Sequence, residues 1–194
     1  MFQIEELKSK IFELYSKTEY DEDDYTVFKE FQNLLNKGEI RAAEKINSEW
    51  IVNTWVKQGI LLGFKMGYNT SISDKEWGFI DKHTYNTRRF TKTDFVRLVP
   101  GGSSVREGSF IGKGVTIMPP SYINTGAYVA EGTMIDSHAL VGSCAQIGSR
   151  VHLSAGSMIG GVLEPINANP VIVEDNVFIG GSCGIYEGVI IGDS

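Results

Sequence analysis

The second half of the chain repeats an aliphatic residue every six positions, and this period limits the fold more than any other feature. Eleven aliphatic residues follow one another six apart: Val99, Val105, Ile111, Ile117, Ile123, Val129, Ile135, Val141, Ile147, Leu153 and Ile159. The fourth position after each is also restricted, from Ser103 to Ser157. Helical and simple strand periods would both repeat the apolar residue sooner. A sustained hexapeptide is typical of a parallel β-helix.

The repeat has a direct physical explanation. Three short strands form one triangular coil, with the aliphatic residue inside and the small residue beside it near the corner. Each buried Ile or Val contributes roughly 1.5–3 kcal/mol through apolar burial, and stacked coils satisfy one another's backbone groups. Six glycines are expected at turns that need unusual backbone angles; they are Gly112, Gly126, Gly132, Gly142, Gly148 and Gly160.

The first half of the chain follows a helical period. Apolar residues from Ile4 to Leu14 and from Tyr25 to Leu35 recur at three and four residues, and Gly38 ends the second run. Residues 39–52 predict a hairpin that turns at Asn47 and Ser48, residues 54–64 a third helix, and residues 66–95 a mixed connection with two strands. We therefore expect a mainly β chain. Residues 1–97 form an α-rich domain with a short hairpin, and residues 98–194 form a left-handed parallel β-helix.

The hexapeptide frame is interrupted once, at residues 160–171. It resumes at Val173, fourteen residues after Ile159 and two more than two hexapeptides. We expect a loop excursion there, where function tends to sit in a rigid solenoid. The sequence stops at residues 192–194, inside a hexapeptide, where a solenoid would expose its apolar cross-section. We expect the β-helix to be truncated at this end and the natural protein to continue.

Composition excludes several classes of function. The net charge is −6 and no run of Lys or Arg occurs, which disfavours nucleic acid or an anionic membrane as partner. The N-terminus resembles neither a signal nor a transit peptide, and no apolar stretch has the roughly 20 residues of a membrane span. Cys144 and Cys183 match no metal or redox spacing, so we expect reduced core residues in a cytoplasmic protein.

Several long strings resemble the tetrahydrodipicolinate N-succinyltransferase family. They are RAAEKINSEWIVNTWVKQGILLGF (41–64), FVRLVPGGSSVREGSFIGKGV (95–115), the segment 119–180 from PPSYINTGAYVAEGTMIDS to VIVEDNVFIG, and EGVIIG (187–192). The resemblance includes the non-repeat loop, which other hexapeptide proteins do not share. It implies an acyltransferase of diaminopimelate and lysine biosynthesis that moves succinyl from succinyl-CoA to the amino group of ring-opened tetrahydrodipicolinate. It also implies a homotrimer with active sites between neighbouring β-helices, succinyl-CoA as co-substrate and no metal.

Two residues of this sequence match residues of the family's active site. Arg97, in FVRLVP, matches an arginine that binds a substrate carboxylate, and a guanidinium can hold a carboxylate through two parallel hydrogen bonds. Asp136, in GTMIDS, matches the aspartate at the substrate amine and is the candidate general base. Read without the resemblance, Arg97 fits a junction salt bridge, and Asp136 fits a turn cap.

Histidines and departures from the family pattern leave alternatives open. His138 is a rival base two residues from Asp136, whereas His83 and His152 suggest only surface or packing positions. Gly184 stands where many members have a glutamate, although Glu187 remains nearby, and Ser137 stands where many have tryptophan.

Other functions compete with this interpretation. The alternatives are tetrahydrodipicolinate N-acetyltransferase, another hexapeptide acyl-CoA transferase, and an inactive fragment or assembly scaffold. The CoA site is expected in coils beyond residue 194. A β-helical carbonic anhydrase needs three zinc-binding histidines at a trimer interface. The chain has three histidines in all, and one of them is far outside the β-helix, which disfavours this class of enzyme.

Overall fold

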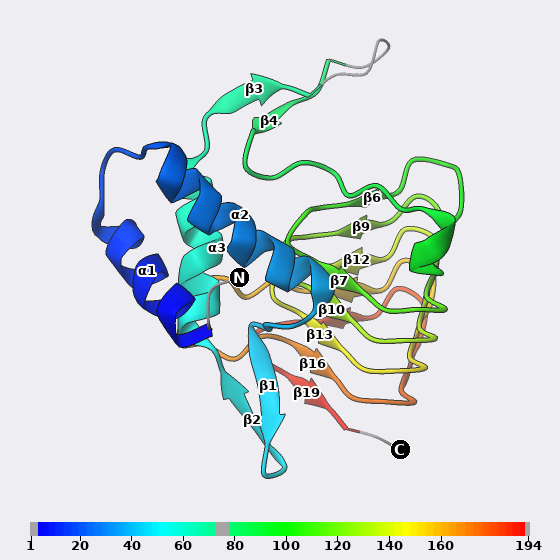
Figure 1. Cartoon of the computed structure of the whole chain (residues 1–194). Coiled ribbons are helices and arrows are strands. Elements are labelled where there is room, and N and C mark those ends of the chain that lie inside the picture. Colours follow the sequence, from blue (N-terminus) through cyan, green and yellow to red (C-terminus); the bar gives the residue numbers. More distant parts are fainter. Residues whose placement is uncertain (1–3, 73–77, 193–194) are drawn as a thin grey trace.

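The structure, a computed structural model, describes residues 4–72 and 78–192. Its N-terminal part contains helices α1 (Ile4–Ser16), α2 (Glu22–Lys37) and α3 (Thr54–Met66), with the antiparallel hairpin β1 (Ala43–Ile46) and β2 (Glu49–Val52) between α2 and α3. These elements confirm the three predicted helices and the hairpin. Figure 1 shows the helices gathered beside the stacked coils of the second half.

The sequence sets both ends of α2. Asp21 caps the helix by accepting a hydrogen bond from the backbone N–H of Asp24, whose carboxylate accepts one from the N–H of Asp21. Gly38 ends the helix in the left-handed conformation, with φ 72°. The apolar faces of the three helices then form one core, which includes Leu7, Phe31 and Ile60.

The connection to the β-helix contains the two predicted strands, β3 (Asn69–Ser71) and β4 (Ile80–Lys82), as an antiparallel pair. A single 3-10 turn, η1 (Lys92–Asp94), follows. Part of the predicted connection, residues 73–77, lies outside the described residues.

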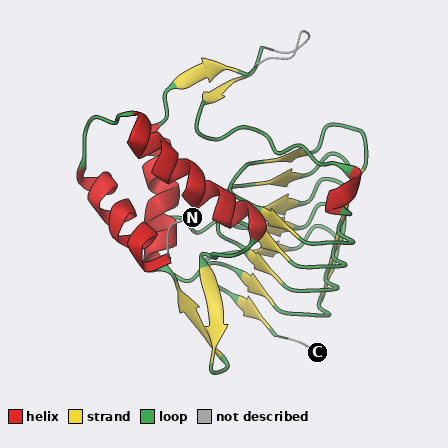
Figure 2. Ribbon diagram, in the orientation of Figure 1, coloured by secondary structure: helices red, strands yellow, loops and turns green. Residues whose placement is uncertain are grey.

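The second half is a parallel β-helix of three five-stranded sheets (Figure 2). The first sheet, D, contains β5 (Arg97–Leu98), β8 (Thr116–Ile117), β11 (Met134–Ile135), β14 (His152–Leu153) and β17 (Phe178–Ile179). Sheet E contains β6 (Ser104–Val105), β9 (Tyr122–Ile123), β12 (Leu140–Val141), β15 (Met158–Ile159) and β18 (Gly184–Ile185). Sheet F contains β7 (Phe110–Ile111), β10 (Tyr128–Val129), β13 (Gln146–Ile147), β16 (Ile172–Val173) and β19 (Ile190–Ile191).

Each strand has two residues, one outward and one inward. Along most of the stack the inward residue pairs with the inward residue eighteen positions later, as Ile135 does with Leu153. The inward aliphatic residues from Val105 to Ile159 are at most 6% exposed, and the small residues Ala127, Thr133 and Ala145 are also buried. The predicted interior of the β-helix is therefore confirmed.

The first coil differs from the prediction. Leu98, and not Val99, pairs with Ile117, and Arg97 pairs with Thr116. By residue 104 the eighteen-residue register is restored, since Ser104 pairs with Tyr122. One extra residue therefore lies between them, in a turn where Gly101 and Gly102 have φ of 142° and 94°. Glycine adopts such angles without steric cost, so the extra residue is accommodated there.

The glycine prediction was correct for only part of the set. Gly126 and Gly132 have positive φ, as expected for turns, whereas Gly112, Gly142, Gly148 and Gly160 do not. These four lie where successive coils or a ring approach closely. A Cβ on Gly142 would stand 2.2 Å from the backbone nitrogen of Gly161, and one on Gly148 would stand 2.6 Å from that of Asp175. Their role is close approach, not backbone angle.

The excursion at residues 160–171 also has a different size from the one expected. β16 directly follows β15, so a single step of the repeat spans the fourteen residues from Ile159 to Val173 and carries eight extra. The loop is packed, not free, because Val162 is 9% exposed and Val171 is fully buried. Lys57 on α3 donates a 2.6 Å hydrogen bond to the carbonyl of Ala168 in this loop.

The two cysteines differ in environment. Cys144 is buried against the helical core, and burial raises the pKa of its thiol to about 12. Cys183 is exposed, which contradicts the expectation that both are core residues, because it lies on an outer turn of the last coils. Both thiols are free.

The three sheets are not covered equally. The N-terminal region packs on sheet F, where Gly38 approaches the rings of Phe110 and Tyr128 and Arg41 bonds to Gln146. Sheets D and E instead present outward side chains to solvent, including Tyr122, Met158 and Phe178 at 36%, 42% and 69% exposure.

Candidate active site

The outer face of sheet D carries a row of side chains that includes the first candidate residue. Register places Arg97, Thr116, Met134, His152 and Phe178 one above another, on five successive strands. Adjacent strands lie about 4.8 Å apart, so Arg97 and Met134 are separated by roughly 10 Å along the stack. Arg97 is exposed, which leaves its guanidinium accessible to a ligand.

Asp136 lies at the corner where sheet D turns toward sheet E, directly after inward-facing Ile135. Its N–H donates to the carbonyl of Leu153 at 2.9 Å, and its own carbonyl accepts from the hydroxyl of Ser121. The carboxylate oxygen Oδ1 accepts a 2.7 Å hydrogen bond from the N–H of Ser137. The carboxylate is thus oriented by its own turn, while its side chain remains 36% exposed.

The structure brings His152, not His138, to Asp136. The Nε2 atom of His152 lies 4.0 Å from Oδ2 of Asp136, and its ring packs at 5.1 Å against Phe178. The sequence alone predicts only a surface or packing position for His152, although the coil length indicates that it lies near Asp136. His152 follows Met134 by one eighteen-residue coil, and Met134 lies two residues before Asp136.

His138 occupies the turn itself. It has φ 63°, its N–H donates to the carbonyl of Pro120 at 2.6 Å, and its side chain is exposed. The corresponding turn positions of the preceding and following hexapeptides are Gly132 and Cys144, which also have positive φ. This position therefore has left-handed backbone in most hexapeptides, and His138 forms no ion pair with Asp136.

Arg97 and Asp136 lie on the same side of the β-helix without touching. An exposed guanidinium and a carboxylate separated by two coils can bind the two ends of a small molecule that bears a carboxylate and an amine. The carboxylate can also accept a proton from that amine. The imidazole of His152, 4.0 Å away, is beyond hydrogen-bonding distance and can act on the carboxylate only through its charge.

Glu187 and Gly184 lie elsewhere on the coil. Gly184 belongs to sheet E, and a Cβ at this position would stand 2.4 Å from the ring of Tyr186. Glu187 lies at the turn from sheet E to sheet F, with φ 51°. Asp136 is at a different corner, so a single chain does not bring Glu187 and Asp136 together.

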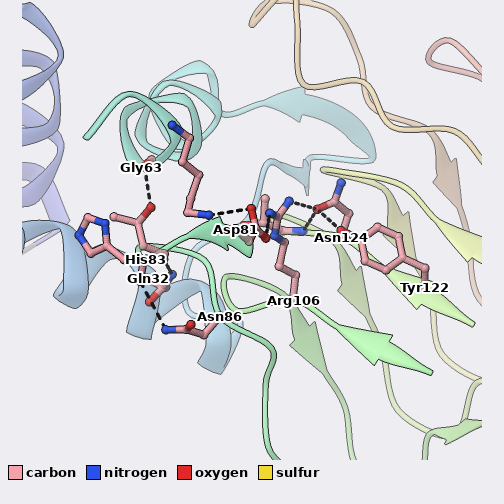
Figure 3. Close-up of polar contacts among 11 residues, drawn as sticks. Gln32, Gly63, Asp81, His83, Asn86, Arg106, Tyr122 and Asn124 are labelled. Carbon is pink, nitrogen blue, oxygen red and sulfur yellow. Dashed lines mark hydrogen bonds and ion pairs between the residues drawn. The ribbon is translucent and has the colours of Figure 1, made fainter. Parts of the chain in front are cut away.

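A second polar cluster, shown in Figure 3, is structural. Arg106 forms an ion pair with Asp81 on β4 and a hydrogen bond with Asn124, which also accepts from the hydroxyl of Tyr122. Gln32 and Thr84 bond to backbone carbonyls in the same region. These contacts attach the β3–β4 connection to sheet E and to the helices, and they use both terminal nitrogens of Arg106.

Two classes of site find no support in the described part of the chain. Residues 4–72 and 78–192 contain no group of three His, Cys, Asp or Glu side chains placed to hold a metal ion. Over the same ranges, no helix is both long and apolar enough to cross a lipid bilayer.

Comparison with known proteins agrees with this architecture. Residues 3–66 match the family model of the tetrahydrodipicolinate N-succinyltransferase N-terminal region, and residues 170–194 match the hexapeptide repeat of succinyl-transferase. The fold and these matches place the chain among the hexapeptide-repeat proteins.

Curated relatives narrow the assignment. A 2,3,4,5-tetrahydropyridine-2,6-dicarboxylate N-succinyltransferase of Shewanella sp. is 54% identical over 82% of this chain and 59% of its own length. Proteins of the same name from Nitrosomonas europaea and Idiomarina loihiensis are 53% and 44% identical, over 84% and 81% of this chain and 60% and 58% of their own lengths. The chain belongs to the tetrahydrodipicolinate N-succinyltransferase family, and it spans about three fifths of the length of these relatives.

Proposed function

We propose that the protein transfers the succinyl group of succinyl-CoA to the amino group of ring-opened tetrahydrodipicolinate, a step of diaminopimelate and lysine biosynthesis. The observation that carries this proposal is the 53% identity to the Nitrosomonas europaea N-succinyltransferase, over 84% of the chain. A match over 84% of the chain includes parts of both the helical region and the β-helix. We place the reaction in the cytoplasm.

The geometry of sheet D supports a role for each residue. Arg97 binds a carboxylate of the acceptor through two parallel hydrogen bonds. Asp136 holds the amine and accepts a proton from it as the nitrogen attacks the thioester carbonyl. The new bond joins that nitrogen to the succinyl carbon, the carbon–sulfur bond breaks, and CoA leaves as the thiolate. The Ser137 N–H orients the carboxylate, and His152 lies 4.0 Å from it.

We further propose a homotrimer with each site between neighbouring β-helices. The exposed apolar side chains of sheets D and E, among them Met158 and Phe178, support an assembly in which these faces are covered. Separation of Asp136 from Glu187 at different corners also fits a site completed by a second chain. Light scattering coupled to gel filtration measures the mass, and a stable monomer at micromolar concentration contradicts the proposal.

The activity is tested by incubating the protein with tetrahydrodipicolinate and either succinyl-CoA or acetyl-CoA. Mass spectrometry identifies the acylated product, and a thiol reagent follows the release of CoA. Faster turnover with succinyl-CoA is expected. Preference for acetyl-CoA supports the acetyltransferase alternative, and no acyl transfer from either donor supports an inactive fragment or a scaffold.

Arg97→Lys tests the role of the guanidinium. Lysine keeps the charge but loses the two-point geometry, so KM for the dicarboxylate should rise far more than KM for succinyl-CoA. Arg89→Lys is a matched control, because Arg89 is also exposed and lies outside sheet D. An equal rise in both KM values means that Arg97 has a structural role.

A further inference from the structure

A cavity of about 400 Å³ lies between the β1–β2 hairpin and the outer side of sheet F. Arg41, Trp50 and Tyr128 line one part of it, and Ser149, Glu174 and Asp175 another. In Figure 1 the hairpin runs beside β16, and the 2.6 Å bond from Lys45 to Glu174 joins the two. The cavity is on sheet F, whereas the candidate active site is on sheet D, so the two are separate.

The guanidinium of Arg41 is held rigidly at this cavity. Its central carbon lies 3.6 Å from the centre of the Tyr128 ring, and its Nε donates to Oε1 of Gln146 at 2.9 Å. Gln146 is 1% exposed, and its amide nitrogen donates to the carbonyl of Cys144 at 2.8 Å, which fixes which end faces Arg41. The site is therefore preorganised, and a ligand would not have to order it.

Arg41 also lacks the partners that the chain's comparable arginines have. Arg88 donates to the carbonyls of Asn36 and Ser109, and Arg106 pairs with Asp81. Among the described residues, Arg41 has no carboxylate within 4.0 Å, and its only side-chain hydrogen bond uses Nε. Desolvation by burial lowers the pKa of Arg41 from its ordinary value. Its two terminal nitrogens remain available as a fork for a carboxylate.

The acidic residues of the cavity define the rest of the ligand. Glu174 accepts hydrogen bonds from Lys45 and from the indole N–H of Trp50, at 2.6 and 2.8 Å. Asp175 uses Oδ1 to accept from the N–H of Ser149, and its Oδ2 lies 3.9 Å from the exposed Arg150. The lining holds two cations, Arg41 and Lys45, and two carboxylates, and Lys45 is already paired with Glu174. This balance disfavours a polyanion such as phosphate, whereas a ligand with both signs of charge complements Arg41 and Asp175.

We propose that this cavity binds a free amino acid in its zwitterionic form. The carboxylate of the ligand lies on the terminal nitrogens of Arg41, and its ammonium group lies toward Asp175. The apolar edge of the cavity, formed by Trp50 and Tyr128, contacts the side chain of the ligand. The volume is of the size that small-molecule sites have.

The indole N–H of Trp50 reports on the site, because it bonds to Glu174 at the cavity wall. Its resonance, assigned with a Trp50→Phe variant, is followed by ¹H–¹⁵N NMR while each of the twenty standard L-amino acids is added. Acetate, methylammonium and inorganic phosphate serve as probes with one charge type. At least one amino acid should give a saturable shift and bind at least tenfold more tightly than acetate or methylammonium.

Variants then assign the two charges. Arg41→Gln should weaken amino-acid binding at least tenfold. Asp175→Asn, on an exposed side chain that can still accept from Ser149, should weaken amino-acid binding but leave acetate binding unchanged. Arg89→Gln, an exposed arginine far from the cavity, should change neither. If Arg41→Gln does not fold, Arg41→Lys and Asp175→Asn carry the test. Absence of a saturable shift with every amino acid, or tighter binding of phosphate, overturns the proposal.

Discussion

Ile147→Ala measures how much one inward residue of the β-helix contributes to stability. Ile147 is fully buried on β13, with Val129 below it on β10 and Val173 above it on β16. The side chain is enclosed by the other two sheets, and rigid coils on both sides limit its collapse. The substitution therefore leaves most of the removed volume as a cavity.

The magnitude follows from two contributions. Removing three buried carbon groups loses about 2.4 kcal/mol of transfer free energy, at about 0.8 kcal/mol each. A residual cavity on the order of 50 Å³ adds about 1.2 kcal/mol, at about 24 cal/mol per Å³. The free energy of unfolding should fall by about 3–4 kcal/mol, within the range known for such substitutions.

The assay is urea unfolding followed by far-ultraviolet circular dichroism, at one fixed protein concentration because assembly also shifts the midpoint. Ile190→Ala is the matched control. It makes the same chemical change on an outward residue of the same sheet, which is 46% exposed, and should cost only about 1 kcal/mol. Equal losses from the two variants would refute the argument from inward and outward positions.

Three further predictions concern Gly142, Lys57 and the candidate general base. Gly142→Ala should cost about 1–3 kcal/mol of unfolding free energy in the same assay, because its Cβ would stand 2.2 Å from the nitrogen of Gly161. Gly78→Ala, with no atom within 4 Å of its Cβ, should cost far less. Burial lowers the pKa of Lys57 below 10.5, so the unfolded chain holds more protons and this residue makes stability rise as pH rises toward 10.5. Lys57→Met should flatten that rise in urea unfolding across pH, and an unchanged slope contradicts the assignment. Asp136→Asn should lower turnover by roughly 10²–10⁴ and His138→Gln by less than about tenfold. His152→Gln should lie between them, and a larger loss from His138→Gln reverses the assignment of the base.

The β-helix was predictable because each hexapeptide places the same residue type in the same environment. Ile135 and Leu153 lie inward for one repeated reason, and ten of the eleven positions in the series support the same conclusion. Val99 was predicted to lie inward because it precedes Val105 by six residues in the sequence. The inward residue is Leu98, seven residues before Val105, because the turn at Gly101 and Gly102 holds one extra residue. Only the pairing of strands reveals it.

Contacts between distant residues account for most of what the sequence did not predict. The approach of His152 to Asp136 follows from the eighteen-residue coil, and it could have been found by adding one coil to Met134. The cavity beside Arg41 could not, since it depends on how the hairpin lies against Gln146, about a hundred residues further along the chain. No local pattern encodes that contact.

The extra residue between Leu98 and Ser104 determines which way Arg97 points. In an uninterrupted eighteen-residue frame, Arg97 would align with Val115, which is fully buried, and Leu98 would take the outward place. Because the turn at Gly101 and Gly102 holds the extra residue, Arg97 keeps the outward place opposite Thr116. Deleting one of these glycines would leave a step of six residues from Arg97 to Ser104 and would preserve that pairing, whereas a turn unable to hold the extra residue would align Arg97 with the buried position. The outward direction of Arg97 at the first coil therefore depends on a glycine turn flexible enough to hold one extra residue.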